Sequence, residues 1–254
     1  VGVLENGAPF MVMEYLNGVD LAGVIKQRGA LPVEDAAEYL LQACEALGEA
    51  HSLGIVHRDL KPGNLFLARR HDGSPCVKVL DFGISKVTSA LGGELEMTST
   101  KAFMGSPLYM SPEQLMSAKT VDHRSDVWSL GVILFELLAG KVPFMGESVA
   151  HLAVQITHEA PLSLRGARPE LEPELEAVVL RCLEKDAGRR YQNVGEFAVA
   201  LAEFGPKRAR ISAERVSRMM RDAGLAGSAL VLPPSSDAKP AVVTASAVAA
   251  SVQV

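Results

Sequence analysis

Four polar residues stand out because their types and spacing could support chemistry on a phosphate group. Residues 57–64 (HRDLKPGN) supply a carboxylate at Asp59, a cation at Lys61 and an amide at Asn64, and a second carboxylate follows at Asp81. A carboxylate can accept a proton, a lysine can neutralise phosphate charge, and oxygen atoms are the ligands that Mg²⁺ prefers. This set suits phosphoryl transfer, in which positioning and charge neutralisation do most of the catalysis.

The residues between Asn64 and Asp81 predict a β-hairpin that would bring these two side chains together. Two β-like runs, Leu65–Ala68 and Cys76–Leu80, are joined by a segment with an Asp-Gly turn signal. If the runs pair antiparallel, the residues just outside the open end of the hairpin come to lie side by side. We therefore expect a hard oxygen site for Mg²⁺ there, with waters and phosphate oxygens as its other ligands.

Helices and one further strand are expected around this loop. The short apolar run Pro9–Tyr15 indicates a buried strand that ends in a turn at Asn17-Gly18. Apolar periodicity and end signals predict helices over Asp20–Arg28, over residues 31–54 and over Val127–Ala139. The last of these is apolar nearly all round, which is typical of a helix at the centre of a core.

The composition is that of an ordinary globular chain. It has 254 residues, 48% hydrophobic and 22% charged, which excludes wholesale disorder and collagen-like repetition. The longest apolar stretch falls short of the ~20 residues that span a bilayer, so no membrane span is predicted. Cys44, Cys76 and Cys182 form no CxxC pair, which argues against a disulfide framework or a zinc site and favours a cytoplasmic setting.

Charge is spread unevenly and suggests three regions. Residues 1–206 carry 18 basic and 27 acidic residues, which argues against nucleic acid as a partner. Residues 207–222 carry six basic and two acidic residues. We expect a folded domain over 1–205, a basic amphipathic helix or linker over 206–223, and a disordered tail rich in Ala, Ser, Pro and Val over 224–254. Docking of the basic stretch to an anionic membrane or a partner is the alternative to a solvated helix.

Four motifs in order resemble the catalytic lobe of eukaryotic-type protein kinases, particularly bacterial members of the family. They are HRDLKPGN (57–64), DFG (81–83), SPE (111–113) and DVWSLG (126–131), and the resemblance runs from about Pro9 to Gly205. It implies an α+β, protein-kinase-like fold. The expected part is a mainly helical C-terminal lobe with a short hinge strand and a β-hairpin, and a small β-rich lobe is expected to be missing.

The resemblance implies a role for each polar residue of the loop, with ATP and Mg²⁺ as cofactors. Asp59 would accept or orient the proton of the substrate hydroxyl, and Lys61 would neutralise the γ-phosphate. Asn64 and Asp81 would hold Mg²⁺. The residues expected to bind the nucleotide are Lys61, Asn64 and Asp81, together with Met13 at the gatekeeper position, Glu14 and Leu16 through backbone groups, Asp20 at the ribose and Phe66 below the purine.

Further residues match structural positions of the family. His57 and Phe82 would stack in the hydrophobic spine that links the catalytic loop to the metal-binding loop. Asp126 would accept hydrogen bonds from the backbone of the catalytic loop. Glu113 and Arg190 match the partners of a buried ion pair.

The acceptor and one means of regulation are also implied. Lys61 two residues after Asp59, and the segment GSPLYMSPE (105–113), are similar to the Ser/Thr class, so protein serine or threonine is the expected substrate. Arg58 would pair with a phosphorylated residue of the loop that follows Asp81. We expect autophosphorylation at Thr98 and Thr100.

Three parts that the family uses are not found in this sequence. There is no GxGxxG loop, and Lys26 lies after the expected hinge, so it cannot be the strand lysine that grips the phosphates. The third part is the helix glutamate that pairs with that lysine, which would also belong before the hinge. We therefore expect little kinase activity from the 254 residues alone, and activity when they are fused to a small lobe. The alternatives are a catalytically inactive remnant that binds proteins, and a non-protein kinase, which SPE and Arg190 disfavour. The setting would be the cytoplasm or the cytoplasmic part of a membrane-anchored kinase, and the oligomeric state is left open.

Overall fold

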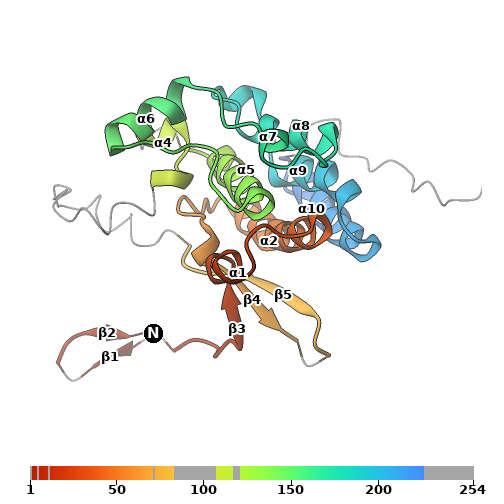
Figure 1. Cartoon of the computed structure of the whole chain (residues 1–254). Helices are drawn as coiled ribbons and strands as arrows, with labels where there is room; N and C mark the ends of the chain where they lie inside the picture. Colours follow the sequence, from red (N-terminus) through yellow and green to blue (C-terminus); the bar gives the residue numbers. More distant parts are fainter. Residues whose placement is uncertain are drawn as a thin grey trace, which may run out of the picture.

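Helices make up most of the part of the chain that the computed structural model describes, which is residues 2–4, 6–10, 12–70, 72–82, 107–116 and 121–225 (Figure 1). Almost all of the expected tail (224–254) lies outside these residues, as do Thr98 and Thr100. Among the helices described, none is both long and apolar enough to cross a bilayer.

Two of the longer helices precede the hairpin and the others follow it, and together they form the body of the fold. The α-helices are α1 (Leu21–Arg28), α2 (Val33–Ser52), α4 (Pro112–Met116), α5 (Arg124–Ala139), α6 (Val149–His158), α7 (Leu164–Ala167), α8 (Pro173–Cys182), α9 (Val194–Leu201) and α10 (Arg210–Asp222). The short 3₁₀ helices are η1 (Pro62–Asn64), η2 (Pro107–Tyr109), η4 (Ala187–Arg189), η5 (Ala202–Phe204) and η6 (Lys207–Ala209). The strands are β1 (Gly2–Val3), β2 (Pro9–Phe10), β3 (Gly18–Asp20), β4 (Leu65–Arg69) and β5 (Pro75–Val79).

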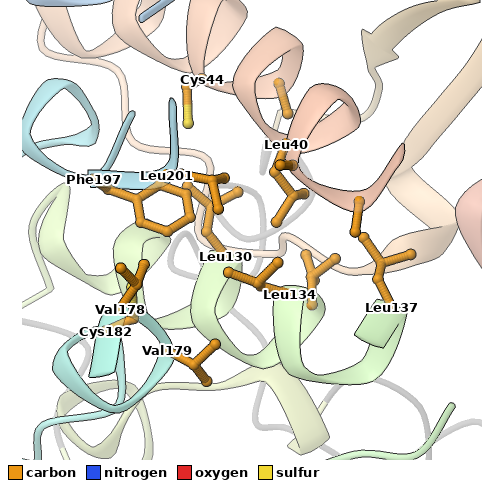
Figure 2. Close-up of a cluster of buried hydrophobic side chains, with 14 of the residues drawn as sticks. Leu40, Cys44, Leu130, Leu134, Leu137, Val178, Val179, Cys182, Phe197 and Leu201 are labelled. Atoms are coloured by element: carbon orange, nitrogen blue, oxygen red, sulfur yellow. The ribbon is translucent and has the colours of Figure 1, made fainter. Parts of the chain in front are cut away.

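Helix α5 lies at the centre of the hydrophobic core, as its sequence predicts. Its side chains are buried on almost every side, and Gly140 in the left-handed conformation (φ 69°) ends it. Figure 2 shows apolar side chains of α2, α5, α8 and α9 meeting in one cluster. This body gives the catalytic loop a rigid support, because the loop lies between α2 and the hairpin in the chain and contacts the start of α5.

The predicted hairpin is confirmed, and it carries a third strand. Strands β4 and β5 pair antiparallel from Leu65 opposite Val79 to Arg69 opposite Pro75. Strand β3 pairs with the other edge of β4, although the sequence analysis assigned Gly18 to a turn. Glycine serves another purpose here, because a Cβ on Gly18 would lie 2.1 Å from the carbonyl oxygen of Leu67. The missing side chain is what lets β3 approach β4.

The prediction of a buried strand over Pro9–Tyr15 is wrong. Among the described residues of this run, only Pro9 and Phe10 are in a strand, which pairs with β1 (Gly2–Val3). Beyond it, Val12, Met13 and Tyr15 are 81%, 69% and 92% exposed. An apolar run becomes a buried strand only where another layer of side chains covers it, and among the described residues no such layer packs on this segment.

Helix α10 is part of the folded body, which differs from the expected domain end at residue 205 and from the expectation of a solvated helix or linker. It packs against α2 and α9, and the side chains of Ala213, Val216 and Met220 are fully buried. The two helices can approach because α2 has Gly48 at the contact, where an added Cβ would lie 3.3 Å from Val216 Cγ1. Packing therefore continues beyond residue 205 to the end of α10.

Basic residues of η6 and α10 serve this packing. Arg208 forms two hydrogen bonds, of 2.7 and 2.6 Å, with the carboxylate of Glu38 on α2. Arg215 Nη1 lies 3.3 Å from Glu45 Oε2, also on α2. Much of the positive charge noted in the sequence is thus paired with carboxylates of the same domain, which weakens the alternative of docking to an anionic surface.

Replacing Met220 with alanine tests whether α10 belongs to the core. We expect the free energy of unfolding to fall by about 2–5 kcal/mol, because the truncation leaves a cavity between α10, α2 and α9. Chemical denaturation followed by circular dichroism measures this. Ile211→Ala on the same helix is the control, because Ile211 is 53% exposed and should cost less than about 0.5 kcal/mol. Equal effects of the two variants would show that α10 is not integrated.

Candidate active site

The catalytic loop, residues 57–64, is fixed by a buried carboxylate at the start of α5. Asp126 is fully buried, and its Oδ2 and Oδ1 accept hydrogen bonds of 2.9 Å from the backbone N–H groups of His57 and Arg58. Its Oδ2 also lies 2.8 Å from Nε2 of His51 on α2. Each contact satisfies a group that would be costly to bury alone. This explains why an otherwise apolar helix carries a carboxylate in its first turn.

The loop places two polar side chains around Asp59. Lys61 Nζ donates to Asp59 Oδ2 at 2.8 Å, and Asn64 Nδ2 donates to the backbone oxygen of Asp59 at 2.8 Å. Asp59 is partly open to solvent, with 23% of its side chain exposed. Because the amide nitrogen of Asn64 faces a carbonyl, its amide oxygen is the atom available to a cation.

The open end of the hairpin brings Asp81 to this loop. The backbone oxygen of Asn64 accepts from Leu80 N at 2.8 Å, which extends the β4–β5 ladder by one bond. His57 Nε2 donates to the Leu80 oxygen at 2.8 Å, and its ring lies 4.9 Å from the ring of Phe82. The residues on both sides of Asp81 are therefore held against the catalytic loop.

The oxygen atoms of Asn64 and Asp81 form a donor set that fits Mg²⁺. They are a neutral amide oxygen and an exposed carboxylate, and both are hard ligands that leave positions for waters and phosphate oxygens. No group of three or more His, Cys, Asp or Glu side chains that could hold a metal occurs among the described residues, at this site or at any other. The hairpin end thus brings the Asn64 backbone next to the residue before Asp81, and metal binding by the two side chains stays a prediction.

The residues expected at the nucleotide base are not gathered with this pair. Glu14 and Leu16 line a cleft with the outer part of the hairpin, including Ala68 and Cys76, and that cleft does not include the catalytic loop. Met13 is exposed, in keeping with the missing strand.

Two other residues expected at the nucleotide lie beside the loop. Asp20 Oδ1 accepts from Gly23 N at 2.7 Å and caps α1, so one of its oxygens is already used. Phe66 on β4 is half-buried opposite Asp20. Asp20 lies at the end of β3, and Phe66 lies on β4, which pairs with β5, the strand that leads to Asp81.

A buried ion pair ties α4 to the C-terminal half of the lobe. Arg190 donates to both oxygens of Glu113 at 2.8 Å, and its side chain is completely buried. Ser125 Oγ adds a bond of 2.6 Å to Glu113. Burial alone raises the pKa of Glu113, but the hydrogen bonds and charge of Arg190, with the bond from Ser125, outweigh it and lower the pKa to about 2.

Acid should weaken this anchor. Since the folded-state pKa of Glu113 lies below its ordinary value, the ionised pair stabilises the fold at neutral pH, and that contribution is lost as the pH falls from about 4.5 toward about 2. Denaturation midpoints measured between about pH 6 and about pH 3 should fall less steeply for Glu113→Gln than for the parent protein. Parallel slopes for the two proteins would contradict this assignment.

Two contacts that support the loop were not expected from the sequence, one to its anchor Asp126 and one to the loop itself. His51 showed no ligand spacing, yet it contacts Asp126 across 75 positions. Gln114 Nε2 donates to the Arg58 oxygen at 2.7 Å across 56 positions. Sequence patterns carry local signals, and neither contact has one.

Comparison with known proteins settles the family. The model of the family described as protein kinase domain matches residues 3–198, which is most of the chain. The chain belongs to the protein kinase domain family. The expectation of a mainly helical lobe is confirmed for the kinase domain, whose described residues hold one two-stranded and one three-stranded sheet as their only sheets.

Bacterial serine/threonine-protein kinases are among the relatives. The kinase domain is 40% identical to PknB of Mycolicibacterium smegmatis over 193 residues, covering 76% of this chain and 30% of that protein. It is 37% identical to PknB of Mycobacterium tuberculosis over 222 residues, which cover 85% of this chain and 34% of that protein. It is 39% identical to Pkn1 of Myxococcus xanthus over 218 residues, which cover 86% of this chain and 30% of that protein. The kinase domain thus spans about a third of the length of these curated relatives.

Proposed function

We propose that this kinase domain takes part in the transfer of the γ-phosphate of ATP to serine or threonine side chains of proteins, in bacterial signalling. The observation that carries the proposal is the grouping of Asp59, Lys61 and Asn64 beside the hairpin end with Asp81. The names of the relatives, all serine/threonine-protein kinases, favour the same chemistry.

Asp59 receives the proton of the acceptor hydroxyl in this proposal. Its carboxylate is partly exposed, so a substrate can reach it, and its backbone is fixed through Asn64. The Lys61 ammonium lies 2.8 Å from Asp59 Oδ2, so it is also near a phosphate group that is bound next to Asp59. The lysine therefore balances the negative charge that gathers beside Asp59.

Asn64 and Asp81 hold Mg²⁺, with the amide oxygen and the carboxylate as ligands. The metal supplies charge neutralisation for the phosphates when it is bound. The protein prepares the site through the backbone, because the Asn64 to Leu80 bond sets the separation of the two ligands. Met13, Glu14, Leu16, Asp20 and Phe66 are proposed to contact the nucleoside.

Regulation by phosphorylation is part of the proposal. Arg58 immediately precedes Asp59, and Thr98 and Thr100 follow Asp81 in the sequence, outside the described residues. A phosphate on either threonine would form charge-assisted hydrogen bonds with an arginine.

We place the domain in the cytoplasm, where the thiols of Cys44 and Cys182, whose pKa values are raised by burial, stay reduced.

Phosphate transfer from γ-labelled ATP tests the proposed function. The full-length protein should phosphorylate a protein substrate in the presence of Mg²⁺ and not after chelation, and hydrolysis of the product should release phosphoserine or phosphothreonine. The 254 residues alone are expected to transfer little. Absence of Mg²⁺-dependent transfer by the full-length protein would favour the alternative, an inactive lobe that binds proteins.

A further inference from the structure

The backbone just before Asp59 adopts a conformation that needs support. Among the described residues other than glycine, Arg58 (φ 66°) and Asp81 (φ 55°) have left-handed backbones. This conformation is unfavourable for residues with a Cβ and persists only where the surroundings hold it. Both residues flank the proposed reaction centre, so the contacts that hold them matter for its geometry.

Both backbone groups of Arg58 are held, from opposite elements. Its N–H donates to Asp126 Oδ1 at 2.9 Å, from α5. Its carbonyl oxygen accepts from Gln114 Nε2 at 2.7 Å, from α4. The second group belongs to the peptide bond that leads directly into Asp59. Asp126 is already accounted for as an anchor of the loop, whereas Gln114 is not a residue of any motif identified in the sequence.

The chemistry of Gln114 suits this position. Its Oε1 accepts from Ser111 N at 3.0 Å and from Ser111 Oγ at 3.2 Å, while its Nε2 donates to Arg58. The Ser111 N–H can only donate and the Arg58 oxygen can only accept, so the orientation of the amide is fixed. A side chain of this length with one acceptor and one donor satisfies both neighbours.

The α4 side of this link is immobile. Ser111 is fully buried, and the next carboxylate, Glu113, is held by the buried Arg190. Gln114 therefore connects a fixed segment to the catalytic loop, and the position of the Arg58 carbonyl follows the position of α4. Residues 111–114 are where the chain returns after the segment that contains Thr98 and Thr100.

We propose that Gln114 is a positioning residue, which orients Asp59 by holding the Arg58 carbonyl and so couples the 111–116 segment to the reaction centre. This inference rests on the proposed function, in which Asp59 acts on the substrate hydroxyl. Loss of the bond would free the peptide group between Arg58 and Asp59 while leaving the nucleotide contacts in place.

Gln114→Glu in the full-length protein is the sharpest test. The variant keeps the length and the acceptor toward Ser111, and it replaces the donor by an oxygen that faces the Arg58 carbonyl. We expect kcat to fall roughly tenfold to a hundredfold while KM for ATP changes less than about twofold. Gln114→Met, which lacks both groups, should also lower kcat. Gln27→Glu, at an exposed position on α1, is the control for the added charge and should match the parent protein.

Hydrogen–deuterium exchange without ATP provides a readout that does not depend on activity. Peptides covering residues 57–64 should exchange at least about fivefold faster in Gln114→Glu than in the parent or in Gln27→Glu. Faster exchange with a lower kcat and an unchanged melting temperature supports the proposal, whereas unchanged exchange overturns it whatever the kcat. If the parent protein transfers no phosphate, the proposed function fails, and the exchange result alone decides whether Gln114 holds the loop.

Discussion

Asp59→Asn is expected to lower phosphate transfer by the full-length protein by roughly 10²–10⁴-fold, with no change in the fold. Asparagine has the same shape and keeps an oxygen near Lys61, but it has no negative charge to draw the proton from the acceptor hydroxyl. The side-chain amide of Asn64 donates to the backbone oxygen of residue 59, so this bond does not depend on the substituted side chain and the loop geometry is preserved. Initial rates of label transfer at saturating ATP measure the loss.

A matched control comes from the turn of the hairpin. Asp72 is exposed and bonds locally to Ser74, so Asp72→Asn removes an equal charge at the turn end of the hairpin, opposite the open end that carries Asp81. Its rate should stay within about twofold of the parent, as expected of a surface substitution. If Asp59→Asn retained more than about a tenth of the parent rate, Asp59 would not be the proton acceptor.

Arg190→Met is expected to cost about 3–5 kcal/mol of unfolding free energy, the largest stability effect that we predict. The substitution leaves Glu113 without its partner. It also removes the donors to the backbone oxygens of Glu184, Arg124 and Lys185. Denaturant titration at neutral pH, where the pair is fully ionised, measures the loss.

The neighbouring residue supplies the control for this variant. Arg189 is exposed, and Arg189→Met removes the same charge from the position next to Arg190, at the end of η4. It should change stability by less than about 0.5 kcal/mol. The double variant Glu113→Gln, Arg190→Met should be more stable than the sum of the single effects predicts, because each single variant leaves one member of the pair alone. Additive effects would mean that the pair does not act as a unit.

The hairpin and the main helices were predictable because their signals are local. The Asp-Gly turn and the two apolar runs sufficed to place Asn64 beside the strand end that leads to Asp81. Likewise, the apolar run of α5 and the glycine after it are signals that lie within one segment. These features depend on neighbours within a few positions, which a sequence pattern records.

The failures all concern partners that lie far away in the sequence. The apolar character of Pro9–Tyr15 does not reveal that no layer covers the segment. The burial of α10 depends on its close approach to α2 at Gly48. The proposed role of Gln114 depends on its hydrogen bond to the Arg58 carbonyl, 56 positions away. Such contacts follow from tertiary packing, which overrides local preference.

The packing of η6 and α10 on α2 also implies a delay during synthesis, because α2 is made long before the segment that covers it. The bond between Arg208 and Glu38 joins residues 170 positions apart. At roughly 5–20 residues per second, a ribosome needs on the order of 10–35 s to synthesise the stretch between them. During that interval the face of α2 around Gly48 has no covering helix, so it is a surface that a chaperone can bind. The α2 side of the helical lobe can close only after α10 has left the ribosome.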